Sequence, residues 1–322
     1  MRALTVSALS DDLSGVALRD APDPVRGPGR LLVRVRAAAL NHPDLLMTRG
    51  AYQLKPALPF TLGMEMAGEV VEADADSGFR PGDRVAAGTR LGAFADLVAV
   101  DAHAARRVPN GMDDAHAAAL GAAYLTAYVA LVRLGGLLPG RWVLVHGATG
   151  GVGLAAVDLA RALDARVVAT SRSPAKLAVV ERDHRPDAVL PAPGFRDAVR
   201  ELTGGGADLV FDPVGGDVFD ESTRCVAFGG RLLVVGFTSG RIAALPTNIA
   251  LIRGFSVVGV RAGEHARRFP DRGAADLDAV WSLAAERRIS PRVHGVFPLA
   301  DWREAFETMA RADHVGKLVL TP

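Results

Sequence analysis

A strand, a glycine-rich loop and a helix follow one another in the middle of the chain, and this feature constrains the fold most. Val143-Leu-Val-His146 is apolar enough for a buried strand. The loop Gly147-Ala-Thr-Gly-Gly-Val-Gly153 follows at once, and residues 154–160 continue as a helix. Glycines permit a tight turn, and a helix N-terminus offers free N–H groups to an anion. In this context the loop predicts a dinucleotide pyrophosphate site rather than a purely structural turn.

Strands and helices alternate after this loop. The expected strands are Trp142–His146, Arg166–Ala169, Ala188–Leu190, Asp208–Phe211, Arg231–Val235 and Phe255–Val260. The expected helices are Val152–Leu163, Pro174–Val180, Phe195–Leu202, Val218–Ala227 and a short one near Asn248. Such alternation predicts a parallel sheet covered on both faces, and six strands suit the doubly wound dinucleotide fold.

The rest of the chain has another pattern. Short strands with turn signals such as Pro81-Gly82-Asp83 predict a small β-barrel in the first third. Two helices should follow, one from Asp113 and one over Leu125–Leu134. We expect the tail to return and complete the first domain. Its predicted elements are helix Ala274–Glu286, strand Val293–Pro298, a helix around Trp302–Ala310 and strand Lys317–Leu320.

Composition sets further bounds. A chain of 322 residues suits two domains. A net charge of +1 gives no reason to expect nucleic acid as a partner. The single cysteine, Cys225, excludes a disulfide within the chain, and we expect it in a helix as an inert core thiol. We find no signal-peptide pattern and no apolar run suited to a bilayer, so we expect a cytoplasmic protein without a membrane partner.

The end of the second strand bears on which dinucleotide binds. An NAD site usually has a carboxylate there that binds the ribose hydroxyls. This chain has none; it has the hydroxyls of Thr170, Ser171 and Ser173 and the cations Arg172 and Lys176. Arginine and lysine suit a 2′-phosphate, so the stretch predicts NADPH (NADP+) as the cofactor. The alternative is a solvated loop with an ordinary helix cap at Ser173.

Several motifs occur in order along the whole chain. They are Asn41-His-Pro-Asp44, Pro59-Phe-Thr-Leu-Gly-Met-Glu-Met-Ala-Gly68, Pro81-Gly-Asp-Arg-Val85, the glycine loop, Asp212-Pro-Val-Gly-Gly216, Gly229-Gly-Arg-Leu-Leu-Val-Val-Gly-Phe-Thr-Ser-Gly240, Val258-Gly-Val260 and Gly316-Lys317. With them the chain resembles the medium-chain dehydrogenase/reductase superfamily, in its zinc-free NADPH:quinone oxidoreductase (zeta-crystallin-like) branch. The resemblance implies an α/β protein. Residues 1–121 and 262–322 would form a GroES-like β-barrel domain, and residues 122–261 a Rossmann domain with a six-stranded parallel sheet.

The resemblance also bears on metal chemistry. Zinc-dependent members carry Gly-His-Glu where this chain has Gly63-Met64-Glu65, and a ligand cysteine before the position of Asn41, where Ala37–Leu40 stand. Thiolate and imidazole make the usual zinc sites, so we expect no metal ligands. None of the tyrosines has a lysine four residues later, so the short-chain dehydrogenase pair is missing too. A quinone or other α,β-unsaturated carbonyl is then the easier hydride acceptor, because hydrogen bonds alone can stabilise its developing charge.

Site residues follow from the loop and from the resemblance. Asn41 and Tyr52 are the candidate catalytic residues; the alternatives are a turn residue for Asn41 and a pocket-lining aromatic for Tyr52. Thr126 resembles a threonine near the nicotinamide, but it could instead bond its own helix. His146 is expected only to pack beside the loop. The expected cofactor-binding residues are Asn41, Thr126, Thr149, Gly150, Gly151, Val152, Ser171, Arg172, Lys176, Gly236, Phe237, Ser239, Val260 and Lys317.

Two other functions stay open at this point. The same hydride chemistry would serve an enoyl-thioester reductase of acyl-CoA or polyketide type. The third hypothesis is a non-catalytic NADPH-binding protein with a structural or RNA-binding role. Nothing in the sequence suggests RNA binding. The apolar sixth strand, Phe255–Val260, should lie at the sheet edge, where unpaired strands invite pairing. We therefore expect a homodimer in which two such strands meet, with a small-molecule substrate as the other partner.

Overall fold

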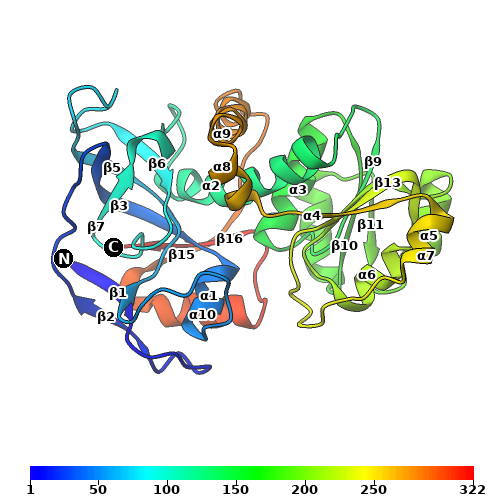
Figure 1. The fold of residues 1–322 in the computed structure, drawn as a ribbon, viewed down its shortest axis with the longest axis horizontal. Helices are drawn as coiled ribbons and strands as arrows, with labels where there is room; N and C mark the ends of the chain where they lie inside the picture. The colour runs from blue at the N-terminus through cyan, green and yellow to red at the C-terminus, as the bar shows by residue number, and fades with distance from the viewer. The chain divides into compact units, whose positions relative to one another are not determined.

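The computed structural model describes all 322 residues, which form two compact units (Figure 1). The first unit comprises residues 1–122 and 291–322, and the second residues 123–290. The first boundary is within a residue of the expected one, but residues 262–290 group with the second unit instead of the first. Two helices explain the difference, α8 (Ala262–Arg268) and α9 (Pro270–Ala285). They pack on each other, and buried Asp276 of α9 pairs with Arg133 of the second unit.

The first unit is built mainly from β-strands. A central strand, β3 (Arg30–Leu40), pairs antiparallel with β5 (Glu65–Glu72), β7 (Leu97–Asp101) and, at its end, β16 (Lys317–Thr321). The returning tail therefore completes this unit, as expected. The other strands of the unit are β1 (Arg2–Val6), β2 (Val16–Asp20), β4 (Phe60–Thr61), β6 (Arg84–Gly88), β8 (Ala105–Arg107) and β15 (Val293–Pro298).

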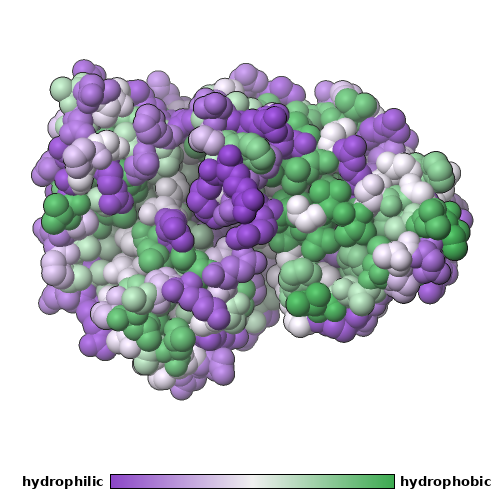
Figure 2. All heavy atoms as spheres, in the orientation of Figure 1, coloured by the Kyte–Doolittle hydropathy of each residue, from purple (hydrophilic) through white to green (hydrophobic).

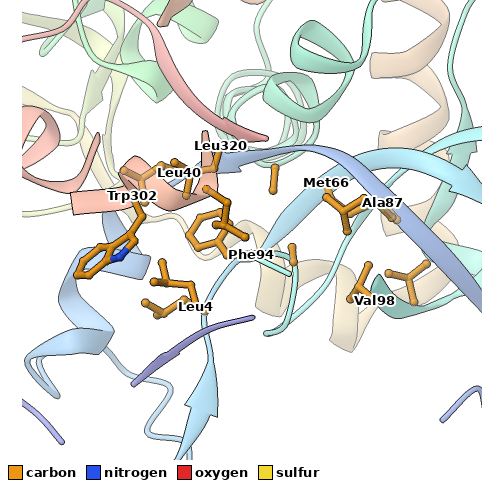
Figure 3. Close-up of a cluster of buried hydrophobic side chains, with 14 of the residues drawn as sticks. Leu4, Leu40, Met66, Ala87, Phe94, Val98, Trp302 and Leu320 are labelled. Atoms are coloured by element: carbon orange, nitrogen blue, oxygen red, sulfur yellow. The ribbon is translucent and has the colours of Figure 1, made fainter. Parts of the chain in front are cut away.

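An apolar core joins these strands to the helices of the first unit. Leu4, Leu40 and Leu320 are buried in it beside Phe94 and Trp302 (Figure 3). The ring of Phe306 meets Phe94 edge-on at 6.2 Å and Trp302 at 5.7 Å between ring centroids. Edge-on ring pairs add stabilisation beyond their buried area. These contacts hold α10 (Trp302–Ala310) on the sheet, and α1 (His42–Thr48) packs against α10.

The second unit contains a six-stranded sheet in the order β11-β10-β9-β12-β13-β14, and every neighbouring pair is parallel. This is the doubly wound dinucleotide-binding order that the sequence predicted, so the expected fold class is confirmed. The strands are β9 (Trp142–Val145), β10 (Arg166–Ser171), β11 (Ala188–Pro191), β12 (Ala207–Asp212), β13 (Val226–Val234) and β14 (Ser256–Gly259). The helices between them are α3 (Gly151–Ala162), α4 (Pro174–His184), α5 (Arg196–Thr203), α6 (Gly216–Ser222) and α7 (Thr247–Arg253).

Two helix predictions were wrong in detail. The helix expected over Val218–Ala227 ends at Ser222, and β13 begins at Val226. Cys225 is therefore a buried residue of the intervening turn and not of a helix. The two helices expected from Asp113 and over Leu125–Leu134 are one continuous stretch, α2 (Asp114–Tyr128) followed by a π-helical segment to Leu134. Gly121 lies at the predicted break, but the helix continues through it, and no proline is present there.

That helical stretch, Asp114–Leu134, is long and apolar enough to cross a membrane by length and composition. We expected no such run from the sequence. Of its most apolar window, 56% is buried inside the protein, and core helices pass the same test. The stretch is therefore weak evidence for a membrane span.

Candidate dinucleotide site and a buried lysine cluster

The glycine loop follows β9 and begins α3. Gly147 has φ +56°, a backbone conformation that glycine adopts without strain. A Cβ on Gly153 would lie 2.2 Å from the carbonyl oxygen of Gly147, so only glycine fits there. A Cβ on Gly150 would have 3.5 Å to its nearest neighbour, so that position has room. The loop therefore needs Gly153, its last glycine, for its own close packing.

The N-terminus of α3 has the properties of an anion site. Leu154 is the first residue of the helix whose N–H bonds to a backbone carbonyl, that of Gly150. The N–H groups of Gly151, Val152 and Gly153 have no backbone acceptor in the chain. These groups and the helix dipole fit the negative charge of a pyrophosphate.

The end of β10 packs against this loop. Thr149 Oγ1 lies 3.3 Å from Ser171 Oγ. Ser173 caps α4, because its hydroxyl accepts the Lys176 N–H at 3.4 Å. Thr170 is different from its neighbours, since it is fully buried and its hydroxyl bonds to His146 at 2.7 Å. Thr170 was expected among the hydroxyls for a 2′-phosphate, and its burial and its bond to His146 contradict that interpretation. Exposed Arg172 follows in the same loop, so Ser171, Arg172 and Lys176 are close along the chain.

The loops after β12 and β13 lie beside the glycine loop. Asp212 Oδ1 accepts the N–H groups of Val214 and Gly215, while its buried Oδ2 has no hydrogen-bond partner and burial raises the pKa of the carboxyl. The loop after β13 bonds back through Ser239 N–H to the carbonyl oxygen of Val214 at 3.0 Å. A Cβ on Gly147 would meet Val214 at 3.3 Å.

The same contacts bring the predicted residues of this loop to one edge of the sheet. Gly236 N–H bonds to the carbonyl oxygen of Asp212, and the Phe237 ring lies against Gly215. Val260 continues β14 at this edge through a 2.8 Å bond to the carbonyl oxygen of Val234. The carboxyl edge of a doubly wound sheet is where such folds bind ligands.

Three predicted site residues lie in the first unit, and two of them form one cluster. Lys317 Nζ donates to Asn41 Oδ1 at 2.7 Å and to Glu65 Oε1 at 2.9 Å. Asn41 Nδ2 donates to the same Glu65 oxygen at 2.9 Å and to the carbonyl oxygen of Ala39 at 3.2 Å. Glu65 Oε2 accepts the N–H of Ala122. Both amide protons of Asn41 are therefore donated within the protein.

Asp44 lies beside this cluster and is fully buried. Its carboxyl oxygens accept the N–H groups of Asn41 at 2.9 Å and Gly63 at 3.2 Å. Burial raises the pKa of Asp44 to about 7. Sequence reasoning assigned no role to Asp44 or Glu65. The Asn-x-x-Asp spacing of a capping box was a usable signal for Asp44.

The remaining two candidates are less constrained. Tyr52, in the loop after α1, is half-buried with its ring against the core of the first unit, and its hydroxyl makes no hydrogen bond within the chain. Thr126 is half-buried on α2 in the second unit. Their roles stay predictions. No group of three or more histidine, cysteine, aspartate or glutamate side chains is arranged to hold a metal ion.

Two family models match the chain. Residues 27–110 match the alcohol dehydrogenase GroES-like domain, and residues 151–278 match a model described as zinc-binding dehydrogenase. Together with the fold and the glycine loop, these matches define a two-domain dehydrogenase.

Individual relatives narrow this class. Mouse quinone oxidoreductase-like protein 2 is 35% identical over 94% of this chain and 87% of its own length. Erythronolide synthase EryA2 of Saccharopolyspora erythraea is 38% identical over 96% of this chain, which is only 8% of that large protein. The quinone oxidoreductase of Thermus thermophilus, solved also with NADPH, is 31% identical with a TM-score of 0.85 over the whole of both chains. The chain belongs to the medium-chain dehydrogenase/reductase superfamily, in its quinone oxidoreductase branch.

Proposed function

We propose that this protein is an NADPH-dependent reductase that delivers hydride to a quinone or another α,β-unsaturated carbonyl without zinc. The observation that carries the proposal is the end of β10, where Ser171, Arg172 and Lys176 stand without a carboxylate and Ser171 contacts Thr149 of the glycine loop. The NADPH complex of the Thermus relative supports it.

The residues of the second unit divide the binding of the dinucleotide between them. The free N–H groups of Gly151 and Val152 would hold the pyrophosphate. Ser171, Arg172 and Lys176 would hold the 2′-phosphate. The predicted contacts nearer the nicotinamide are Thr126, Gly236, Phe237, Ser239 and Val260. When bound, NADPH supplies the hydride.

The first unit would supply groups for the substrate. Both amide protons of Asn41 are used internally, so we assign Asn41 to the wall of the site, held in place by Lys317 and Glu65. Tyr52 has a hydroxyl without an internal partner, so it is the better candidate to donate a hydrogen bond to the substrate oxygen. Replacing Tyr52 by Phe tests this through kcat/KM.

Zinc independence rests on the residues at the position where zinc-dependent relatives bind the metal. Met64 provides a thioether instead of an imidazole, and Glu65 is already paired with Lys317. Thiolate, imidazole and carboxylate are the usual zinc ligands, and a paired carboxylate is a poor one. Full activity after dialysis against a chelator supports this part of the proposal, and activity that returns only with added zinc contradicts it.

Substitution of the two cations tests the cofactor assignment. Arg172→Ala and Lys176→Ala should each raise the dissociation constant for NADPH by roughly 10- to 100-fold, as expected for a lost charge-assisted contact, and leave NADH unchanged. Arg200→Ala, an exposed arginine on α5, is the matched control. Equal weakening of both dinucleotides would contradict the 2′-phosphate assignment.

An enoyl-thioester reductase is the second candidate, favoured by the likeness to EryA2 over nearly the whole chain. The hydride chemistry is the same, so the acceptor decides between the two. Faster turnover of crotonyl-CoA than of 9,10-phenanthrenequinone would favour the thioester. Tight NADPH binding without turnover of any acceptor would leave the third candidate, a non-catalytic NADPH-binding protein. The expected cytoplasmic location stays a prediction.

We also propose a homodimer through the edge of the second unit's sheet. Strand β14 is an edge strand, and large apolar side chains beside it are exposed: Phe228 at 87%, Leu251 at 82% and Ile252 at 75%. Figure 2 shows hydrophobic residues gathered at the right-hand end of the view, where α7 lies in Figure 1. A second copy would pair the free strand edge and cover these side chains.

A further inference from the structure

We infer that His146 is a positioning residue for the dinucleotide, because it joins the glycine loop to the two neighbouring segments that carry cofactor contacts. The inference rests on the proposed function. Sequence reasoning had expected only packing at this position. His146 is the residue between β9 and the loop, and its side chain is completely buried.

The imidazole bonds in two directions. Nδ1 lies 2.7 Å from Thr170 Oγ1, and Nε2 lies 2.8 Å from Ser222 Oγ. The Ser222 hydroxyl donates to the carbonyl oxygen of Val218 at 2.6 Å, so its oxygen accepts the proton of Nε2. Nδ1 then accepts the Thr170 hydroxyl. This order of donors fixes one neutral tautomer, and burial lowers the pKa of His146 to about 3.

Each partner leads to a segment of the cofactor site. Thr170 also bonds through its carbonyl oxygen to the N–H of Ala148 in the glycine loop, at 3.0 Å. The next residue, Ser171, contacts Thr149. His146 thus fixes the side chain of Thr170, and Thr170 connects the glycine loop to the proposed 2′-phosphate loop.

The second direction leads to the segment after β12. Ser222 lies in the last turn of α6, the helix that begins at Gly216 directly after the loop packed on Gly147. The Phe195 ring, from the segment after β11, packs on the imidazole at 4.7 Å between centroids. The neutral ring of His146, which itself follows β9, therefore contacts the end of β10 and the segments that follow β11 and β12. Rigid support of this kind is what a binding site requires of the residues behind it.

The test uses three substitutions and measures binding and stability separately. His146→Phe keeps a ring against Phe195 and removes both hydrogen bonds. Thr170→Val removes one bond with little change in shape, and Thr170→Ser restores the hydroxyl. Tyr124→Phe is the matched control, because it deletes another hydrogen bond of the second unit, the 2.6 Å bond from Tyr124 to Asp158, which lies in the middle of α3 and not at its N-terminus.

We expect His146→Phe and Thr170→Val to raise the dissociation constants of both NADPH and NADH by about tenfold, since the glycine loop serves both. Thr170→Ser should bind like the wild type. Arg172→Ala differs from these variants because it should affect NADPH alone. Tyr124→Phe should lower the unfolding temperature without changing either dissociation constant.

The outcomes separate this inference from the proposed function. If the wild type binds NADPH and the His146 and Thr170 variants bind it within twofold as well, His146 has only a structural role and the inference is overturned. If His146→Phe fails to fold, the Thr170→Val and Thr170→Ser pair decides alone. If the wild type binds neither dinucleotide, the proposed function itself fails.

Discussion

Lys317 has an environment that restricts substitution. Its ammonium pairs with Glu65, and the two side chains are only 6% and 2% exposed. Lys317→Met leaves a buried carboxylate without a cation, which should cost about 3–5 kcal/mol in the free energy of unfolding. Urea denaturation measures this cost. The exposed Lys55→Met is the control and should change stability by less than about 0.5 kcal/mol.

A double variant tests whether the loss comes from the unpaired charge. Lys317→Met combined with Glu65→Gln removes both charges, so it should be more stable than Lys317→Met alone. A double variant that is less stable than the single one would contradict this explanation.

The burial of neutral His146 predicts how the stability of the protein changes at acid pH. Its pKa is about 3 in the folded protein against an ordinary 6.5, so below pH 6.5 only the unfolded chain takes up the proton. The stability due to the neutral imidazole is complete above pH 6.5 and falls by about 1.4 kcal/mol for each pH unit below it. The stability difference between wild type and His146→Phe should therefore shrink by about 2 kcal/mol from pH 7 to pH 5. A difference that stays constant over this range, measured by urea denaturation, would contradict the buried neutral state.

At this scale the sequence suggested residues whose chemistry is local and missed those whose partners are distant. The roles of Arg172 and Lys176 stay predictions, which rest on the missing carboxylate in the same short stretch. The pairing of Lys317 with Glu65 joins segments 252 residues apart, and the bond of His146 to Ser222 spans 76 residues. No pattern within one segment shows such partners.

The glycine loop gives the clearest prediction for a single element. Gly153→Ala places a methyl group 2.2 Å from the Gly147 oxygen, so the loop must shift. We expect a loss of about 1–3 kcal/mol of stability together with weaker dinucleotide binding, as for other overpacked sites. Gly150→Ala has 3.5 Å of room at its Cβ and a φ of −82°, so its stability should stay within about 0.5 kcal/mol of the wild type. Thermal unfolding of the two variants compares them directly, and equal losses would contradict the packing account.

Among the elements, the sequence predicted the strands with a clear apolar pattern correctly, but it did not predict the boundaries between elements. All six strands of the parallel sheet were predicted, since each is a short apolar run between turns. Helix α8 was missed, because Ala262–Arg268 is rich in charge and has little apolar periodicity. Its Glu264 accepts hydrogen bonds from Arg267 and Arg268, which supports the helix by pairs three and four residues apart.

The whole molecule should be a dimer. Leu251→Glu together with Ile252→Glu puts charge on the apolar surface beside β14, so sedimentation at micromolar concentration should change from dimer to monomer. Val25→Glu is the matched control, because Val25 is 88% exposed but lies in the first unit. A wild type that sediments as a monomer would contradict the homodimer.

The central claim concerns which cofactor and acceptor the whole protein uses. The most direct measurement is the rate of dinucleotide oxidation with NADPH and NADH, each against 1,2-naphthoquinone, an enone and crotonyl-CoA, after treatment with a chelator. We expect NADPH oxidation with the quinone or the enone, at a kcat/KM at least about tenfold above that with NADH, the factor expected from one lost charge-assisted contact. Equal use of NADH, or no turnover of any acceptor by a protein that binds NADPH, would contradict the proposed function.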